Sequence, residues 1–290
     1  MSSAPLTYAL VTPARDEAGN LRRLAASVEA QTVHPVEWVI VDNGSADGTA
    51  DVVLELAARL PWVRLVRSPG AVGAARGAPI VRAFMAGLES LESDPEIVVK
   101  LDADLSFPPE HFEGLLAAFA AEPRLGIAGG VCWEEVGGVW KPQFATRDHV
   151  RGAARAYRRA CLDDVLPLAE RMGWDGVDEL KAQTRGWRIR SLPELPIRHH
   201  RALGGRERRL AKWVAQGDMA HFMGYRPSYL LCRALYRAAQ EPSALAMVWG
   251  YARAALQRRP RYEDAATRAH LRREQSLLRL PERFREARGR

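Results

Sequence analysis

Four apolar segments alternate with helical segments in the first hundred residues, and this alternation constrains the fold more than any other feature of the sequence. The apolar segments are residues 7–12, 37–41, 63–66 and 96–101. Between them, apolar side chains recur at helical spacing, over residues 20–31, around Val52 and Leu56, and up to about Leu88. Strands that are apolar along their whole length and are separated by helices predict a parallel α/β sheet covered on both faces.

The chain turns polar directly after three of these strands. The polar clusters are residues 13–17, 42–45 and 102–104. In open α/β sheets, ligands bind beyond the carboxyl ends of the strands. The three clusters therefore predict one ligand site at this edge of the sheet.

Two carboxylates stand one residue apart at the end of the fourth strand, as Asp102 and Asp104 with Ala103 between them. Carboxylates at this spacing can converge on a hard divalent cation such as Mg2+ or Mn2+, which completes its shell with phosphate oxygens and water. The alternative interpretation is a polar turn before a helix that begins near Pro108 and Pro109. The position at the carboxyl edge of an α/β sheet favours the metal site.

Beyond residue 104 the pattern is less regular. Residues 126–133 are predicted to form a strand, residues 137–138 a turn, residues 150–159 the start of a helical stretch, and residues 192–200 a strand that enters a loop. From Leu210 onward the sequence has the spacing of amphipathic helices. We therefore expect two domains, an α/β domain over residues 1–205, which carries the predicted ligand site, and a basic helical extension over residues 206–290.

Three motifs, in this order, resemble family 2 glycosyltransferases of the GT-A fold. They are Pro-Ala-Arg-Asp-Glu at residues 13–17, Val-Asp-Asn-Gly-Ser-Ala-Asp-Gly-Thr at 41–49 and Leu-Asp-Ala-Asp-Leu at 101–105. The resemblance covers about residues 7–200. It implies a GT-A-type, Rossmann-like α/β fold with a mixed, mainly parallel sheet flanked by helices, here followed by a C-terminal helical extension. It also implies a nucleoside-diphosphate-sugar donor with Mn2+ or Mg2+ as the cofactor.

The resemblance assigns residues to the donor site. In the family, the first loop and the Asp that ends the second strand hold the nucleotide, and the Asp-x-Asp motif binds the metal that bridges the diphosphate. Matched position by position, the expected residues are Pro13, Ala14, Arg15, Glu17, Asp42, Asn43, Arg76, Lys100, Asp102, Ala103 and Asp104. Three of them have another interpretation, since Glu17 would also suit a helix cap, Asp42 an Asx turn and Arg76 a surface salt bridge.

An inverting transfer needs a carboxylate that takes the proton of the acceptor hydroxyl. Members of the family carry this Asp at a helix start, ahead of a Gly-aromatic-Arg entry to a strand. Gly186-Trp-Arg is such an entry here, and Asp175 stands eleven residues before it. Trp174 precedes Asp175 where the family usually has Glu, and Asp178 is the second candidate for the base.

Two further segments complete the expected site. His199 and His200 follow the last predicted strand, where GT-A enzymes often carry a metal-binding histidine, and strand alternation leaves only one of the two rings directed at the metal. Residues 149–159 resemble the family segment below the donor sugar, in which Arg151 and Gly152 are the expected substrate contacts. Large aromatics in α/β proteins more often belong to the core, but three tryptophans are candidates for stacking on a sugar ring: Trp133, Trp140 and Trp174.

The charge is divided unevenly along the chain. The whole chain carries 42 Lys and Arg against 35 Asp and Glu, whereas residues 198–290 carry 21 against 8. A basic helical region with interleaved aromatics favours peripheral contact with a membrane surface. The other interpretation is packing on the catalytic domain or on a second copy in a homodimer. No recognised nucleic-acid module appears, so nucleic acid is not an expected partner.

Cysteine spacing and apolar runs bear on the compartment. Cys132, Cys161 and Cys232 are too far apart for a disulfide framework or a zinc site and are expected to be buried. The first residues contain no signal-peptide pattern, and the apolar run 243–256 is too short to span a bilayer. We expect a cytoplasmic protein, either soluble or peripheral on the inner face of the plasma membrane.

Together these features predict a metal-dependent, inverting glycosyltransferase of the hexosyltransferase type. It would move a sugar from a nucleoside-diphosphate sugar to a hydroxyl of a glycan, lipid-linked or small-molecule acceptor, with Asp175 as the general base. One alternative is a polyprenyl-phosphate sugar synthase, because residues 102–109 resemble that branch, whose anionic phosphate acceptor needs no strong base. The alternative from a different class is a non-catalytic nucleotide- or polyanion-binding protein.

Overall fold

A computed structural model describes residues 6–70, 77–143, 149–200 and 209–276. The chain forms two compact units, Met1–Arg201 and Ala202–Arg290, and each is described by itself. The domain boundary expected between residues 205 and 206 lies outside the described residues and stays a prediction.

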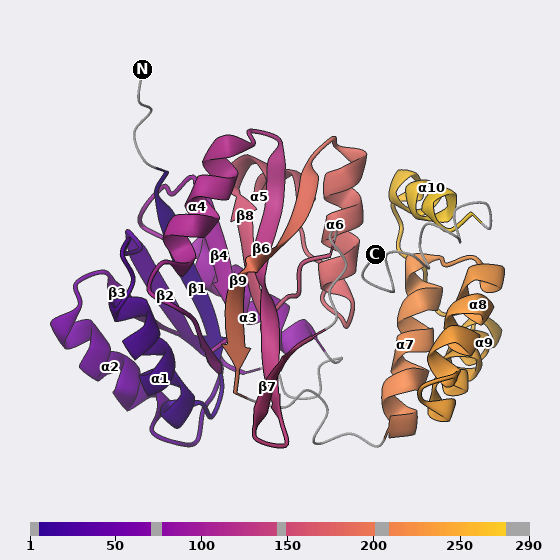
Figure 1. The fold of residues 1–290 in the computed structure, drawn as a ribbon, viewed down its shortest axis with the longest axis horizontal. Helices are drawn as coiled ribbons and strands as arrows, with labels where there is room; N and C mark the ends of the chain where they lie inside the picture. Colours follow the sequence, from indigo (N-terminus) through magenta and orange to yellow (C-terminus); the bar gives the residue numbers. More distant parts are fainter. Residues whose placement is uncertain (1–5, 71–76, 144–148, 201–208, 277–290) are drawn as a thin grey trace. The chain divides into compact units, whose positions relative to one another are not determined.

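The first unit is a layered α/β structure (Figure 1). Its elements follow in chain order, with strands and helices alternating up to α4: β1 (Tyr8–Ala14), α1 (Ala18–Glu29), β2 (Glu37–Asp42), α2 (Thr49–Arg59), β3 (Val63–Arg67), α3 (Ala78–Glu89), β4 (Ile97–Leu101), β5 (Leu105–Ser106), α4 (His111–Ala121), β6 (Leu125–Val136), β7 (Val139–Pro142), β8 (Ala154–Arg158), α5 (Arg159–Val165), α6 (Trp174–Thr184) and β9 (Arg188–His199).

One mixed sheet runs through this unit, and the described residues give it the order β3-β2-β1-β4-β8-β6-β9-β5, with β7 paired to β6. The strands β3, β2, β1 and β4 are parallel to one another. β8 then runs antiparallel between β4 and β6, and β9 runs parallel to β6. The parallel half follows from the right-handed strand-helix-strand connections of the first hundred residues.

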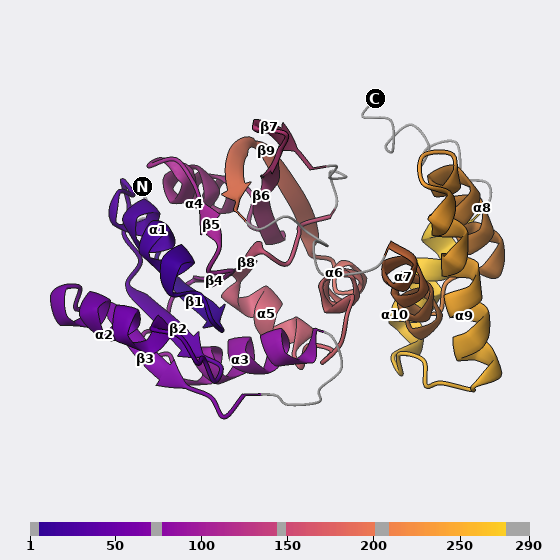
Figure 2. The same cartoon turned by 90° about the horizontal axis from the view of Figure 1, so that it is seen from below.

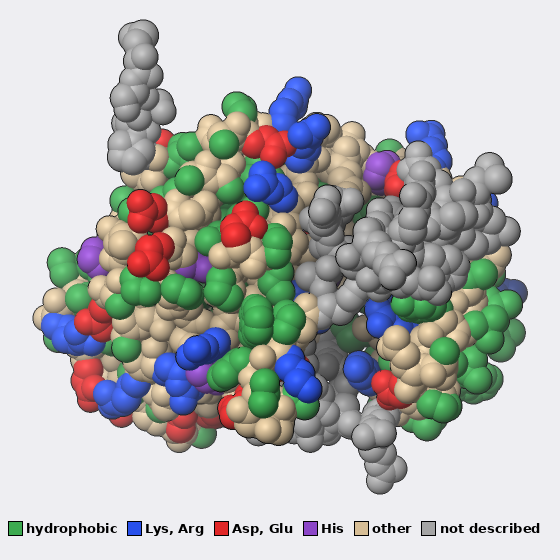
Figure 3. Space-filling model, viewed as in Figure 1, with side chains coloured by type: hydrophobic (Ala, Val, Ile, Leu, Met, Phe, Trp, Pro, Cys, Tyr) green, Lys and Arg blue, Asp and Glu red, His purple; other side chains and the backbone are tan. Residues whose placement is uncertain are grey.

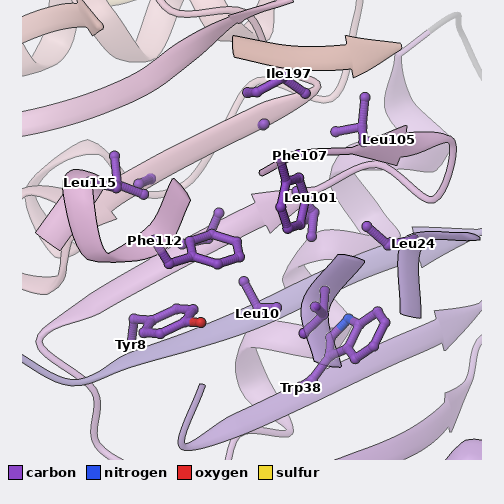
Figure 4. Close-up of a cluster of buried hydrophobic side chains, with 14 of the residues drawn as sticks. Tyr8, Leu10, Leu24, Trp38, Leu101, Leu105, Phe107, Phe112, Leu115 and Ile197 are labelled. Carbon is purple, nitrogen blue, oxygen red and sulfur yellow. The ribbon is translucent and has the colours of Figure 1, made fainter. Parts of the chain in front are cut away.

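Both faces of the sheet are buried, because alternate residues of each central strand enter different cores. Tyr8 and Leu10 of β1 join a cluster with Leu24 of α1 and Phe112 of α4 (Figure 4). Val11 of the same strand belongs instead to a cluster with residues of α3, α5 and α6. Figure 2 shows these two helical layers on either side of the sheet. The period of two and the double burial explain why most residues of β1, β2 and β4 are apolar, with Lys100 of β4 as a buried exception.

Two expectations from the sequence are wrong. Residues 150–159 do not begin a helix, because residues 154–158 form β8, whose buried position between β4 and β6 overrides the helical preference of Ala-Arg-Ala. Cys132 and Cys161 are buried as free thiols, but Cys232 is only half-buried.

The second unit is helical, with α7 (Arg209–Met223), α8 (Pro227–Ala238), the 3-10 turn η1 (Pro242–Leu245), α9 (Ala246–Leu256) and α10 (Ala265–Glu274). α7 and α9 pack backbone against backbone. A Cβ at Gly217 would lie 2.0 Å from the carbonyl oxygen of Met247, and one at Gly250 would lie 2.1 Å from that of Val214. Among the described residues, no helix is long and apolar enough to cross a bilayer.

This close packing predicts that Gly250→Ala destabilises the full chain by about 1–3 kcal/mol, since the added methyl group forces the two helices apart. Gly19→Ala in α1 is the matched control, because a Cβ there meets nothing within 4 Å. Urea unfolding followed by circular dichroism measures both variants. Equal midpoints for the two variants would contradict the close contact.

Candidate active site

Two loops at the carboxyl edge of the sheet are joined by hydrogen bonds. Asp16 N donates to Ser45 Oγ at 3.0 Å, and Ala46 N donates to Asp16 Oδ1 at 2.7 Å. One residue further, Glu17 N donates to Thr49 Oγ1 at 2.8 Å. Asp16 has a φ of +54°, which non-glycine residues rarely adopt, so these bonds hold a strained turn. The first wall of the expected nucleotide site is thus built by the chain's own hydrogen bonds.

The expected residues of β1 and β2 lie side by side in this wall. Pro13 pairs with Val41, and Ala14 pairs with Asp42. Asp42 is buried, and its Oδ1 accepts a hydrogen bond from Ser45 N at 3.0 Å. This bond reaches three residues along the chain, one more than in the Asx turn that the sequence offered as an alternative. It uses one carboxylate oxygen of Asp42 to shape the loop.

The other expected nucleotide residues differ in exposure. Arg15 is exposed, whereas Glu17 and Asn43 are buried. Glu17 stands at the N-cap position of α1 but makes no side-chain cap, and its Oε2 accepts from Asn20 Nδ2 at 2.7 Å. The helix-capping interpretation of Glu17 is therefore wrong. Arg76 lies outside the described residues.

A buried lysine joins the Asp-x-Asp motif to the segment that carries Gly152. Lys100 lies in β4, and its Nζ donates both to Asp102 Oδ1 and, at 2.6 Å, to the Gly152 carbonyl. The Trp174 ring centroid lies 5.7 Å from the same ammonium. Burial raises the pKa of Asp102 although Lys100 acts against the shift, and the nearby Asp104 adds to it. Lys100 thus fixes Asp102 relative to Gly152, while Ala103 is buried between the two acids.

Asp104 and His199 form the second part of this polar centre. The short strand β5 pairs with β9 so that Leu105 lies opposite His199. His199 Nε2 lies 3.4 Å from Asp104 Oδ2, and His199 Nδ1 lies 3.5 Å from Glu134 Oε1 but makes no hydrogen bond. The pKa of His199 is raised, because burial, which lowers it, is outweighed by hydrogen bonding and charge from Asp104.

His200 points elsewhere, as strand alternation requires. Its Nε2 lies 2.7 Å from Ser106 Oγ, and its ring packs edge-on against Trp140 at 5.4 Å. Burial, together with the charge of Arg23, lowers the pKa of His200. The His200 backbone N donates to the Asp104 carbonyl at 2.9 Å, but of the two imidazole rings only that of His199 meets the Asp104 carboxylate.

The donor set fits a divalent cation by its chemistry. Carboxylate oxygens with one imidazole nitrogen are ligands that Mn2+ accepts, and His199 Nδ1, which makes no hydrogen bond, lies in this buried centre 3.5 Å from Glu134 Oε1. Within the described ranges, no three His, Cys, Asp or Glu side chains already converge as a metal cage. In the present arrangement Asp102 is paired with Lys100, so a cation would take Asp104 and His199 first and complete its shell from the diphosphate and water.

Arg151 brings a positive charge to the same centre. It is half-buried, and its charge acts on Cys132 together with the charges of Asp102, Asp104 and Glu134. Burial is the main reason that the pKa of Cys132 is raised to about 11; the three acids add to the shift, and Arg151 opposes it. Arg151 and the three acids therefore all act electrostatically on the same buried thiol.

Asp175 stands in the first turn of α6, beside Gly152. A Cβ added to Gly152 would lie 3.5 Å from Asp175 Oδ2 and only 2.7 Å from Trp174 Cζ2. The missing side chain at Gly152 therefore allows the segment to approach α6. Asp175 is half-buried and keeps access to solvent, as a group that contacts an acceptor must. Trp174 is buried, so the expected stacking role gains no support from its exposure.

Asp178 is held inside the protein. Arg155, which has no exposed surface, donates through Nη2 to Asp178 Oδ1 and to Glu179 Oε1, at 2.8 Å each. The Tyr157 hydroxyl donates to the other oxygen of Asp178. Burial raises the pKa of Asp178 to about 7 against the effect of Arg155. Since Asp178 is 1% exposed and has both oxygens engaged, it does not reach a bound acceptor.

The sequence model of the family described as glycosyl transferase family 2 matches residues 9–233, which is more than half of the chain. The chain belongs to this family. The match begins in β1 and extends into α8, so it contains every residue of the site described above. The family expected from the three motifs is confirmed.

Curated relatives in the family act on lipid carriers according to their names. An undecaprenyl-phosphate 4-deoxy-4-formamido-L-arabinose transferase of Pseudomonas savastanoi pv. phaseolicola is 31% identical over 190 residues, covering 59% of this chain and 53% of that protein. An N-acetylglucosaminyl-diphospho-decaprenol L-rhamnosyltransferase of Mycobacterium tuberculosis is 26% identical over 140 residues, covering 47% and 45%. The chain thus spans about half the length of the curated relatives it matches.

Solved structures show the same fold. The mannosyltransferase PcManGT from Pyrobaculum calidifontis, in complex with GDP-Man and Mn2+, matches with a TM-score of 0.60 at 18% identity, over 97% of this chain and 83% of that one. Residues 1–349 of TarS from S. aureus match with a TM-score of 0.53 at 20% identity, over 67% and 60%. These likenesses confirm the expected GT-A fold, and at such identities they show the fold alone.

Sequence reasoning missed the buried cluster around Arg155, together with Glu134. The signal was an Arg and a Tyr set among small apolar residues at 154–157, with two adjacent acids at 178–179. Reading residues 150–159 as a helix hid it, because strand alternation is what points Arg155 and Tyr157 to one side.

Breaking this cluster should destabilise the fold strongly. Arg155→Ala leaves two buried carboxylates unpaired, so we expect a loss of about 3–5 kcal/mol in the free energy of unfolding. Arg22→Ala is the control, because Arg22 pairs with Glu55 at 60% exposure and should cost less than about 1 kcal/mol. Urea titration of both variants measures the difference, and a small effect for Arg155→Ala would refute the role given to the cluster.

Proposed function

We propose that the chain is an inverting glycosyltransferase that moves a sugar from a nucleoside-diphosphate sugar to an acceptor hydroxyl, assisted by a divalent metal. One observation carries the proposal. Lys100 donates to both Asp102 and the Gly152 carbonyl, and Gly152 adjoins the Asp175 carboxylate. The metal motif and the candidate base thus lie on either side of one short segment, as a displacement between donor and acceptor requires.

The donor side rests on the loops at the carboxyl edge of the sheet. The turn at residues 13–17 and the loop after Asp42 would hold the base and ribose, and Arg151 would meet the diphosphate. PcManGT was solved with GDP-Man and Mn2+, and TarS with UDP-GlcNAc, which supports a nucleotide-sugar donor here too. A divalent cation held by Asp104 and His199, with Asp102 beside it, would neutralise the departing diphosphate.

The acceptor side rests on Asp175. Its carboxylate would take the proton of the acceptor hydroxyl while the hydroxyl oxygen forms a bond to the anomeric carbon. In the same step the bond from that carbon to the diphosphate breaks, and this single displacement inverts the anomeric centre. Asp178 acts indirectly in this proposal, since it holds Arg155, which in turn donates to the Asp175 carbonyl at 2.8 Å.

A polyprenyl-phosphate acceptor is the second candidate. The name of the relative from P. savastanoi specifies undecaprenyl phosphate, and the Asp-Ala-Asp-Leu-Ser-Phe-Pro-Pro segment resembles that branch. A phosphate oxygen is already anionic, so this reaction needs no proton transfer to Asp175. The expected cytoplasmic location, at the inner face of the plasma membrane or free of it, and the expected homodimer stay predictions.

Nucleotide binding tests the donor half. We expect at least one of UDP, GDP and dTDP to raise the melting temperature, and to raise it further with Mn2+, because a ligand at a hundred times its Kd adds about 2.7 kcal/mol of stability. Asp104→Asn and His199→Gln should remove the Mn2+-dependent part, whereas His200→Gln should keep it. Stabilisation without Mn2+, and no diphosphate released from any donor, would instead indicate a non-catalytic binding protein.

The candidate base is tested by Asp175→Asn. Transfer to a hydroxyl acceptor should fall by about 10²–10⁴-fold while the nucleotide-induced thermal shift stays unchanged. Asp51→Asn is the matched control, since Asp51 is an exposed Asp in the first turn of α2. If wild type and Asp175→Asn glycosylate polyprenyl phosphate equally well, the second candidate replaces the first.

A further inference from the structure

The second unit exposes large apolar side chains in one short stretch. The described residues contain eleven exposed large hydrophobic side chains, and five of them lie between residues 231 and 256. Trp249 is 60% exposed and Leu256 is 79% exposed. The five residues, which we call the apolar patch, are Leu231, Leu235, Leu245, Trp249 and Leu256. Exposed apolar groups gathered in this way mark an interaction surface.

Helical spacing brings the patch residues into two adjoining stripes. Leu231 and Leu235 are one turn apart on α8. Leu245, Trp249 and Leu256 follow at steps of four and seven along η1 and α9, on the side of α9 away from the buried Met247, Gly250 and Ala254. α8 packs against both η1 and α9. Figure 3 shows hydrophobic side chains on the surface of these two helices.

The charge around the patch is mainly positive. Residues 219–262 contain seven arginines and one acid, Glu241, and Asp218, just before this stretch, pairs with Arg259 at 2.7 Å. Arg253 lies one turn after Trp249, and the exposed Arg258 and Arg261 follow the end of α9. Arg233 and Arg237 stand one turn apart on α8; burial lowers the pKa of Arg237, and the charge of Arg233 lowers it further. This region therefore favours an anionic partner.

We propose that the apolar patch binds the surface of an anionic phospholipid bilayer. Leucine and tryptophan side chains would enter the boundary between headgroups and acyl chains, and the arginines would remain at the level of the lipid phosphates. A second copy of the chain is the less favoured occupant, since a symmetric contact would bring together two faces on which arginines outnumber acids. The proposal is independent of the transfer reaction, because it uses no residue of the candidate active site.

Vesicle co-sedimentation of the full chain tests the proposal. We expect binding to vesicles of phosphatidylcholine with 30 mol% (about one third) phosphatidylglycerol, and little binding to phosphatidylcholine alone. The triple variant Leu235→Ser, Trp249→Ser, Leu256→Ser should bind the anionic vesicles at least about tenfold more weakly, because it removes most of the exposed apolar area. Arg258→Gln with Arg261→Gln should weaken binding about tenfold or more and reduce its salt dependence.

The matched control is Leu54→Ser with Ile80→Ser, which removes apolar side chains of similar exposure from α2 and α3. The control should bind vesicles as wild type does. Each of three results would overturn the proposal. They are equal vesicle binding by the patch variant and wild type, an equal loss of vesicle binding in the control and the patch variant, and no binding of wild type to anionic vesicles. Light scattering tests the other occupant. If wild type is a dimer that does not bind vesicles and the patch variant is a monomer, the patch serves self-association and the proposal is overturned. The nucleotide-induced thermal shift of the patch variant is measured as a folding control. A shift equal to that of wild type would show that the variant is folded, so its loss of vesicle binding would not reflect unfolding or a failure of the proposed function.

Discussion

The buried ion pairs of Arg155 are the interactions on which the proposed acceptor side of the candidate site depends. The Arg155 guanidinium is fully buried in β8 and holds the carboxylates of Asp178 and Glu179 on α6. A buried ion pair contributes little net stability compared with an apolar pair, but it is costly to break, so it fixes geometry more than it adds free energy. Here the fixed geometry is the start of α6, because the same guanidinium donates to the Asp175 carbonyl.

Lys100 repeats this arrangement on the donor side, and Trp174 links the two. The Trp174 ring centroid lies 5.7 Å from the ammonium of Lys100 and 5.7 Å from the guanidinium of Arg155. A ring that packs against both buried cations shields them from water and strengthens the hydrogen bonds that each makes. This arrangement gives a physical account of Trp174 where related enzymes usually carry Glu. The acids that neutralise Arg155 stand four and five residues later, at positions 178 and 179.

The sequence predicted β1, β2 and β4 and the polar edge beyond them, because uninterrupted apolar strands with helices between them have few other solutions. It could not choose between His199 and His200, since that choice depends on the pairing of β5, a strand of two residues that leaves no periodic signal. It misread β8, whose Ala-Arg-Ala sequence favours a helix until neighbouring strands bury it. Asp178 was left as a candidate base for the same reason, because only β8 shows that Arg155 and Tyr157 engage it.

The charged residues of the two units have different surroundings. In the first unit, Asp102 pairs with the buried Lys100, and Asp178 and Glu179 pair with the buried Arg155. These acids therefore serve the structure of the candidate site. In the second unit, the sequence between residues 219 and 262 contains seven arginines and one acid, and the same stretch carries exposed leucines and an exposed tryptophan. Buried ion pairs fix a geometry and are little affected by salt. Exposed cations attract an external anionic partner, and dissolved salt screens this attraction. The internal geometry of the candidate site should therefore depend less on ionic strength than binding of the second unit to an anionic surface does.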